Sequence, residues 1–284
     1  MNAEDMTYRK KSSLWAGFIL ILFLLSAWSY GEFDVTDALV LFGLCFACEL
    51  VDSGLGMGYG TILTPTLLML GYHPQEFVPT ILFSELLSGF TASFFHNEIK
   101  NVELSLRGKD FRPAVILATG SVVGVSAGVF LSFNIPKDVL KVTIGCIILT
   151  SGLFVILVSR RVIEYKRWKM LVLSIAASFN KAVSGGGYGP LVTSGQILSG
   201  VQGKAAIGIT SFAEAFTCLF AVVFFLSQGG FINLKIFIPM CAGALLSVPC
   251  SVFAIHKANG GLLKIIVGIV TMSLGALTIY KALS

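Results

Sequence analysis

The most informative feature of this sequence is its shortage of charge. Asp, Glu, Lys and Arg together make up 12% of its 284 residues, whereas a soluble domain carries about 25%. Hydrophobic residues make up 55% of the chain, and they recur in runs of about 20, the length that spans a bilayer as a helix. The runs lack the alternating polarity of outer-membrane barrel strands. The composition excludes a water-soluble domain and predicts an all-α polytopic membrane protein.

Motifs for catalysis and for metal or nucleotide binding are also missing. The chain has three histidines, and none belongs to an H-E-x-x-H, a Ser/His/Asp arrangement or a Cys cluster at ligand spacing. The six cysteines lie in apolar segments and are interpreted as buried thiols rather than disulfides. The net charge of +5 is spread over short loops, which is typical of topology signals. We therefore expect no enzyme, no metal, no cofactor and no nucleic-acid partner.

The apolar runs predict seven full spans and two interrupted regions. The interrupted regions cover about 36–71 and 168–200, and each half is about 15 residues, too short to cross a core of roughly 30 Å without tilting. The sequence leaves open whether these halves form re-entrant hairpins or steeply arranged broken helices. The first run lacks a small-x-small cleavage site, so a retained helix is preferred over a signal peptide. The full spans are expected at about 14–31, 77–97, 111–133, 137–159, 204–227, 234–256 and 260–282.

Basic loops mark one side of the predicted bundle. Lys and Arg precede the first helix and recur in the 97–112 and 159–169 loops, whereas the 31–37 loop carries only acidic charge. The positive-inside rule then places the N-terminus in the cytoplasm and the C-terminus outside. The basic residues are Arg9, Lys10, Lys11, Lys100, Arg107, Lys109, Arg112, Arg160, Arg161, Lys166, Arg167 and Lys169.

Two parts of the chain are copies of each other. Tyr59 and Tyr188 both lie in Gly-Tyr-Gly, 188 − 59 = 129 residues apart, and Glu85 matches Glu214 at the same offset. After a shorter connection the offset becomes 264 − 141 = 123, where Lys141, Gly145 and Gly152 match Lys264, Gly268 and Gly275. An odd number of crossings per copy inverts the second copy, and such repeats hold substrate near the midplane at discontinuous helices. The predicted parts are an extra N-terminal segment (1–35), repeat 1 (36–159), a basic linker (160–167) and repeat 2 (168–284), forming one transport domain.

Gly-rich breaks in the two interrupted regions give the strongest site signal. Glycine lets backbones approach closely or adopt a positive φ, and unpaired backbone at membrane depth needs a protein partner or a polar cavity. A helix that restarts after such a break directs N–H groups and a positive dipole end toward an anion. The alternative is that the glycines only allow close helix packing. The predicted substrate-binding residues at the breaks are Gly56, Gly58, Tyr59, Gly60, Gly185, Gly186, Gly187, Tyr188 and Gly189.

Charged residues inside the predicted membrane region are the second signal, because each is costly unless paired or hydrated. Lys181 lies beside the second break and is the preferred contact for an anion's oxygens; the alternative is a structural ion pair with Asp52 or Glu49. Asp52 is interpreted as a helix cap or a coupling carboxylate. Glu85 and Glu214 are candidates for proton carriers, because burial raises the pKa of a carboxyl group, or for structural bonds to the broken helices.

The first break reads Ser53-Gly-Leu-Gly-Met-Gly-Tyr-Gly-Thr-Ile-Leu-Thr-Pro65, and the second reads Ser184-Gly-Gly-Gly-Tyr-Gly-Pro190. This doubled motif resembles the TauE/SafE family of sulfite exporters, over nearly the whole chain after the first helix. The resemblance implies transport of sulfite, thiosulfate, organosulfonates or related anions across a bacterial or archaeal plasma membrane. Met57 and Tyr59 interrupt the common glycine run, and the first helix is additional. These departures leave the substrate's identity open.

We interpret the chain as a bilayer-embedded secondary transporter for a small sulfur-containing anion, working by alternating access. A passive anion channel on the same scaffold is the main alternative. Export follows from the resemblance alone. The sequence leaves proton or sodium coupling, and assembly as a homodimer, as open options.

Overall fold

The computed structural model describes residues 35–158, 167–254 and 260–283, and these residues form ten helices without a strand. The prediction of an all-helical fold is therefore confirmed. The helices are α2 (Val35–Leu55), α3 (Tyr59–Met69), α4 (Pro74–Glu98), α5 (Phe111–Asn134), α6 (Lys137–Val158), α7 (Arg167–Ser184), α8 (Tyr188–Leu198), α9 (Gly203–Ser227), α10 (Leu234–Ala254) and α11 (Gly260–Leu283).

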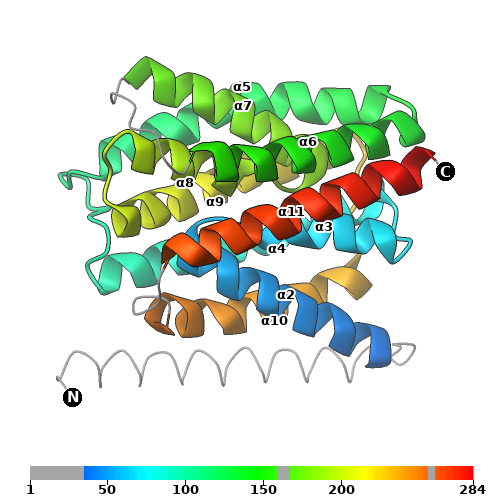
Figure 1. Cartoon of the computed structure of the whole chain (residues 1–284), viewed down its shortest axis with the longest axis horizontal. Helices are drawn as coiled ribbons and strands as arrows, with labels where there is room; N and C mark the ends of the chain where they lie inside the picture. Colours follow the sequence, from blue (N-terminus) through cyan, green and yellow to red (C-terminus); the bar gives the residue numbers. More distant parts are fainter. Residues whose placement is uncertain (1–34, 159–166, 255–259, 284) are drawn as a thin grey trace.

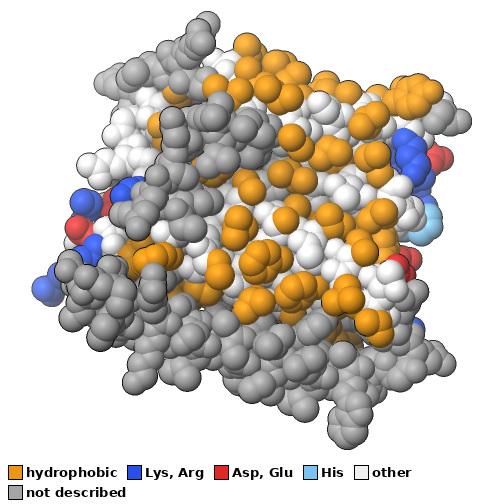
Figure 2. Space-filling model, turned by 60° about the horizontal axis from the view of Figure 1, so that its bottom comes forward, with side chains coloured by type: hydrophobic (Ala, Val, Ile, Leu, Met, Phe, Trp, Pro, Cys, Tyr) orange, Lys and Arg blue, Asp and Glu red, His pale blue; other side chains and the backbone are white. Residues whose placement is uncertain are grey.

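Six of the described helices are long and apolar enough to cross a membrane: α2, α4, α5, α6, α9 and α10. The last five coincide within a few residues with predicted full spans, and α11 lies where a sixth was predicted. The predicted first helix at 14–31 lies outside the described residues. Figure 2 shows a broad hydrophobic band on the face in view, with charged side chains gathered at its two ends. This surface is that of a multi-pass membrane protein.

The two helices of each interrupted region differ more in length than predicted. The expected halves of about 15 residues are wrong, because α2 has 21 residues and α3 has 11, while α7 has 18 and α8 has 11. Each long helix ends where glycines take up a positive φ, at Gly56 (71°) and Gly58 (145°) in the first region. Gly56 lies two to three residues past the midpoint of the 36–71 run, and Gly185 lies one residue past that of the 168–200 run. The non-helical residues of each break, and the turn after each short helix, both fall in the second half of the run, which shortens that half.

Both interrupted regions fold as hairpins. Figure 1 shows α3 returning toward the end of the bundle from which α2 enters, and α8 returning in the same way beside α7. Tyr72, just after α3, lies near Asp37 in the first turn of α2; burial, followed by the charges of Asp37 and Glu76, raises the pKa of the Tyr72 phenol. Of the two arrangements that the sequence left open, the hairpin is the one observed.

Helix packing follows the predicted pairing of the two copies. If α2, α3, α4, α5 and α6 are exchanged for α7, α8, α9, α10 and α11, the α2–α10 contact becomes α7–α5, and both contacts are extensive. The α4–α10 and α3–α11 contacts likewise become α9–α5 and α8–α6, which are also present. In Figure 1 the α2–α3 hairpin opens toward the end that holds the C-terminus, and the α7–α8 hairpin opens toward the other end. These are the relations between helices that an inverted repeat requires.

Glycines that matched between the copies meet in the α6–α11 contact. A Cβ added to Gly152 would lie 2.9 Å from the carbonyl oxygen of Gly268, and one added to Gly275 would lie 2.6 Å from the amide nitrogen of Leu149. Small residues allow helix backbones to approach in this way in membranes, where no hydrophobic force drives helices together. The matched glycines of this pair therefore serve packing.

The ends of the bundle carry different loops. Figure 1 places the 97–112 loop, the end of α6 and the start of α7 at one end, and the end of α11 at the other. This agrees with the prediction that the 97–112 and 159–169 loops share a side. Residues 159–166 and the basic residues before the first helix lie outside the described residues.

Candidate functional site

The two Gly-rich breaks cross each other, backbone against backbone. A Cβ added to Gly186 would lie 2.6 Å from the carbonyl carbon of Gly60, and one added to Gly189 would lie 2.9 Å from the Cα of Met57. A Cβ on Gly60 would collide with the Gly185 carbonyl. All nine predicted site residues at the breaks are buried. In this conformation the glycines serve close packing, as the alternative interpretation proposed, and the crossing is closed.

Reciprocal threonine bonds tie the two breaks together. Thr64 Oγ1 of α3 donates to the Ser184 carbonyl oxygen at 2.7 Å, and Thr193 Oγ1 of α8 donates to the Gly56 carbonyl oxygen at 2.7 Å. The threonines are equivalent by the repeat offset, since 193 − 64 = 129. The last carbonyls of a helix lack partners within it, so each short helix satisfies a carbonyl at the end of the other copy's long helix.

The two short helices begin differently. The Tyr59 N–H of α3 donates to Asp52 Oδ1 at 3.2 Å, so a carboxylate of the chain itself lies at that positive helix end. The cap residues, Gly58 of α3 and Gly187 of α8, are both glycines without a side-chain cap of their own, so the Asp52 carboxylate is what distinguishes the two starts. Lys181 stands where Asp52 stands in the first copy, since 181 − 52 = 129. Asp52 therefore occupies the start of α3, whereas no carboxylate is bonded to the N–H groups at the start of α8 among the described residues.

A buried lysine lies at the centre of the site. The Lys181 side chain has no exposed surface, and its Nζ donates to Glu214 Oε1 at 2.8 Å and also to Glu85 Oε2. These three residues come from α7, α9 and α4. The alternative that Lys181 pairs with Asp52 or Glu49 is wrong in its partners. The ion pair is formed instead with the two glutamates that the repeat made equivalent.

Acidic groups outnumber the lysine around this ion pair. One carboxylate oxygen from each of Asp52, Glu85 and Glu214 lies within 4.8 Å of the others, and all four charged residues together carry 1 − 3 = −2 when ionised. Glu49, also buried, accepts from Ser53 Oγ at 2.5 Å and from Ser88 Oγ at 3.1 Å. Unbalanced charge is expensive in a low-dielectric interior. The arrangement therefore favours uptake of positive charge beside Lys181.

Comparison with known proteins shows the family to which this chain belongs. The family model described as sulfite exporter TauE/SafE matches residues 40–278, which include both breaks and all four charged residues of the cluster. The chain belongs to this family. It is also 26% identical, over 235 residues, to the probable membrane transporter protein YtnM of Bacillus subtilis strain 168, covering 78% of this chain and 75% of that protein. No solved structure matches. The resemblance predicted from the doubled motif is confirmed, and the protein is a TauE/SafE membrane transporter.

The carboxylate cluster of this TauE/SafE chain is what inspection of the sequence missed. A metal site was not expected, because no ligands lie at metal-binding spacing along the chain. Three helices nevertheless bring Asp52, Glu85 and Glu214 close enough to hold a cation. Lys181 is bonded to two of the three. The pairing of Glu85 with Glu214 by repeat offset was the one signal that linked them.

The two tyrosines of the TauE/SafE breaks have different neighbours. The Tyr59 hydroxyl lies 2.8 Å from Ser84 Oγ. Tyr188 lies beside a cluster of buried hydroxyls in which Ser121 Oγ and Thr217 Oγ1 are 2.6 Å apart. Both rings are wholly buried. In this conformation the Tyr59 hydroxyl bonds to a serine of α4, and the Tyr188 ring packs in an apolar cluster that includes Leu117 of α5.

Proposed function

We propose that this TauE/SafE transporter carries small sulfur-containing anions, such as sulfite, thiosulfate or organosulfonates, by alternating access between two inverted repeats. The observation that carries the proposal is a buried lysine held by two glutamates in a cluster with a surplus of carboxylates. A purely structural ion pair needs no surplus of acid, whereas this cluster has three carboxylates for one ammonium. The family's name supplies the class of anion and the direction of export.

Lys181 is the proposed anion-binding group. In the closed conformation the Lys181 ammonium donates hydrogen bonds to Glu85 and Glu214. Neutralising either glutamate weakens its ion pair with Lys181. The ammonium can then donate to a substrate oxygen in place of that carboxylate. The N–H groups at the start of α8 supply further donors for the same oxygens. Anion binding and charge uptake by the carboxylates are linked, because both act on one buried ammonium.

The proposed coupling ion is a proton, with sodium as the second candidate. A proton neutralises one carboxylate without requiring space, and the closed crossing leaves little room at the breaks. Sodium needs several oxygen ligands, which Asp52, Glu85 and Glu214 supply only if Lys181 moves away. Transport that is stimulated by a proton gradient in nominally sodium-free buffer favours the proton as the coupling ion. A strict requirement for sodium favours the second.

The closed crossing fits an occluded state of a carrier. The backbones of Gly60 and Gly186 are in close contact at the crossing, and a passage opened there would require one hairpin to move against the other. The chain is expected to lie in a bacterial or archaeal plasma membrane with the N-terminus inside and the C-terminus outside. A passive channel would need a continuous path past the same contact.

Two measurements test the proposal. The melting temperature of the purified protein is recorded with sulfite, thiosulfate, sulfoacetate, taurine and sulfate, and a transported anion is expected to raise it. Counterflow is then measured in proteoliposomes preloaded with the stabilising anion. Transient accumulation of external labelled anion against its gradient supports a carrier, whereas simple equilibration indicates a channel. If no sulfur anion shifts the melting temperature or crosses the membrane, the proposal is wrong.

A further inference from the structure

A second group of basic residues lies far along the chain from Lys181, at the end of the bundle that holds the C-terminus. The residues line a cavity of about 150 Å³ between the end of α3, the start of α6 and the end of α11. Its lining contains Lys141, Lys281, His73 and Thr278, and no Asp or Glu. The rest of the lining is Leu68, Met69, Gly71, Tyr72 and Ala282. Net positive charge on a small concave surface concentrates anions.

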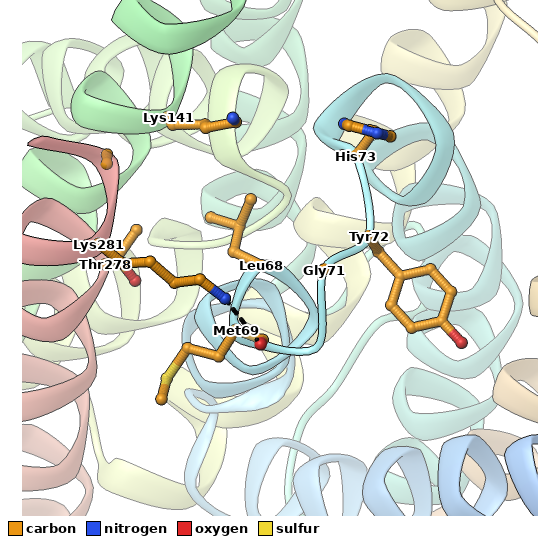
Figure 3. Close-up of a pocket in the computed structure, with 9 residues that line it drawn as sticks. Leu68, Met69, Gly71, Tyr72, His73, Lys141, Thr278 and Lys281 are labelled. Carbon is orange, nitrogen blue, oxygen red and sulfur yellow. Dashed lines mark hydrogen bonds between the residues drawn. The ribbon is translucent and has the colours of Figure 1, made fainter. Parts of the chain in front are cut away.

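The side chains are arranged to receive an anion at the opening. In Figure 3 Lys141 and His73 point toward each other across the cavity, above Leu68, and the ring of Tyr72 is turned away. The Lys281 Nζ lies lower and donates to the Met69 carbonyl oxygen at 3.0 Å. That carbonyl belongs to the last turn of α3, the negative end of the helix, so Lys281 offsets a charge that would otherwise repel an anion.

The described acidic groups nearest the cavity are not part of its lining. Asp138, one turn before Lys141, accepts from Lys141 Nζ at 3.3 Å and has 86% of its side chain exposed. Such an exposed pair is weak and screened by salt. Asp37 and Glu76 act on Tyr72 from outside the lining. The described lining therefore carries two lysines and no carboxylate.

The corresponding end of the other copy keeps only one of these three basic residues. By the repeat offsets, Tyr72 and His73 correspond to Val201 and Gln202, since 201 − 72 = 129, and Lys281 corresponds to Val158, since 281 − 158 = 123. Of Lys141, Lys281 and His73, Lys141 alone has a matching basic residue, Lys264. The two ends of an inverted repeat would be alike if the basic residues only served folding. The difference points to a task at one end only.

We propose that this cavity is a peripheral binding site for small oxyanions, from which substrate enters or leaves the transport path along α3. The idea rests on the proposed anion transport. The α3 helix joins the cavity at Met69 to the central crossing at Tyr59, a span of about 16 Å for 11 residues. Lys141 and His73 contact the anion, and Lys281 adds charge and holds the end of α3. The chemistry recognised is a single oxyanion group, from a free anion rather than a lipid phosphate.

The test uses [³⁵S]sulfite binding to the full chain in a neutral detergent. The variant Lys141→Gln/Lys281→Gln is compared with Lys235→Gln, which removes an exposed charge at the start of α10 outside the cavity. We expect the double variant to lose one class of site, or to bind about 3–10-fold more weakly at low ionic strength. Lys141→Arg/Lys281→Arg keeps the charges and is expected to bind as the unmodified protein does, which separates charge from folding.

The outcomes are distinct for the two proposals. Unchanged sulfite binding by the double variant, or no sulfite binding by the unmodified protein, overturns the peripheral site, even if another anion is transported. Wild-type transport by Lys181→Ala overturns the central role of Lys181 and leaves the peripheral site standing. In nanodiscs, binding should be equal in phosphatidylcholine and phosphatidylglycerol. If the double variant instead loses binding of phosphatidylglycerol but still binds sulfite, the cavity is a lipid site and the proposal is wrong.

Discussion

Replacing Lys181 with methionine tests how the central charges are balanced. The variant keeps the length of the side chain but leaves the buried Glu85 and Glu214, with the half-buried Asp52 beside them, without their ammonium. Removing one partner of a buried ion pair costs about 3–5 kcal/mol, because the remaining charge is uncompensated. At roughly 2–4 °C per kcal/mol for a chain of this size, the melting temperature should fall by about 6–20 °C.

Neutralising the carboxylates should restore most of that stability. In Lys181→Met/Glu85→Gln/Glu214→Gln the uncompensated charge is largely removed, and pairs replaced as a unit are often neutral for stability. Acid should act in the same direction, since protonation neutralises the carboxylates. The deficit of the single variant should therefore shrink as the pH falls, while that of the triple variant should stay constant.

The assay is thermal unfolding in detergent, followed by size-exclusion chromatography, between pH 5 and pH 8 in steps of one unit. Lys235→Met, an exposed lysine outside the cluster, is the control and should unfold like the unmodified protein. Equal losses in the single and triple variants, or a deficit in the single variant that does not change with pH, would refute the charge-balance argument.

Three further predictions concern the breaks. Gly60→Ala should prevent correct folding because its Cβ meets the Gly185 backbone, whereas Gly43→Ala, with nothing within 4 Å, should be tolerated; monodispersity on size exclusion reports both. Thr193→Val leaves the Gly56 carbonyl without its 2.7 Å bond and should cost about 1–3 kcal/mol, seen as a lower melting temperature. Asp52→Asn keeps an acceptor for the α3 start but removes charge, so it should alter the dependence of flux on the proton gradient more than it alters stability.

Much of the fold could be predicted from the sequence because the membrane requires long apolar helices. The boundaries of α5 and α9 followed from hydrophobicity, and the breaks followed from glycines that end helices. The lengths of the halves did not, because an apolar run does not reveal which glycine takes a positive φ. The positive-φ glycines Gly56 and Gly185 lie against Thr193 and Thr64 of the other copy, and the hydrophobic pattern does not reveal these contacts.

The central cluster could be predicted only in part. Asp52, Lys181, Glu85 and Glu214 were identified singly, because charge in an apolar segment is conspicuous. Their pairing was missed, since Lys181 lies 181 − 85 = 96 residues from Glu85 and hydrophobic patterns carry no information on which helices meet. The basic cavity was missed for the same reason, because Lys141 and Lys281 are far apart in sequence and each looks like an ordinary residue at a helix end.

Equilibrium binding of the labelled transported anion to Lys181→Ala tests the central claim most directly. The measurement compares it with the unmodified protein and with Lys235→Ala in the same detergent and buffer, by scintillation proximity. If Lys181 holds the anion, affinity at the transport site should fall by at least about tenfold in Lys181→Ala, as for the loss of a hydrogen bond to a charged group, and should not change in Lys235→Ala. Undiminished high-affinity binding by a folded Lys181→Ala protein would contradict the account.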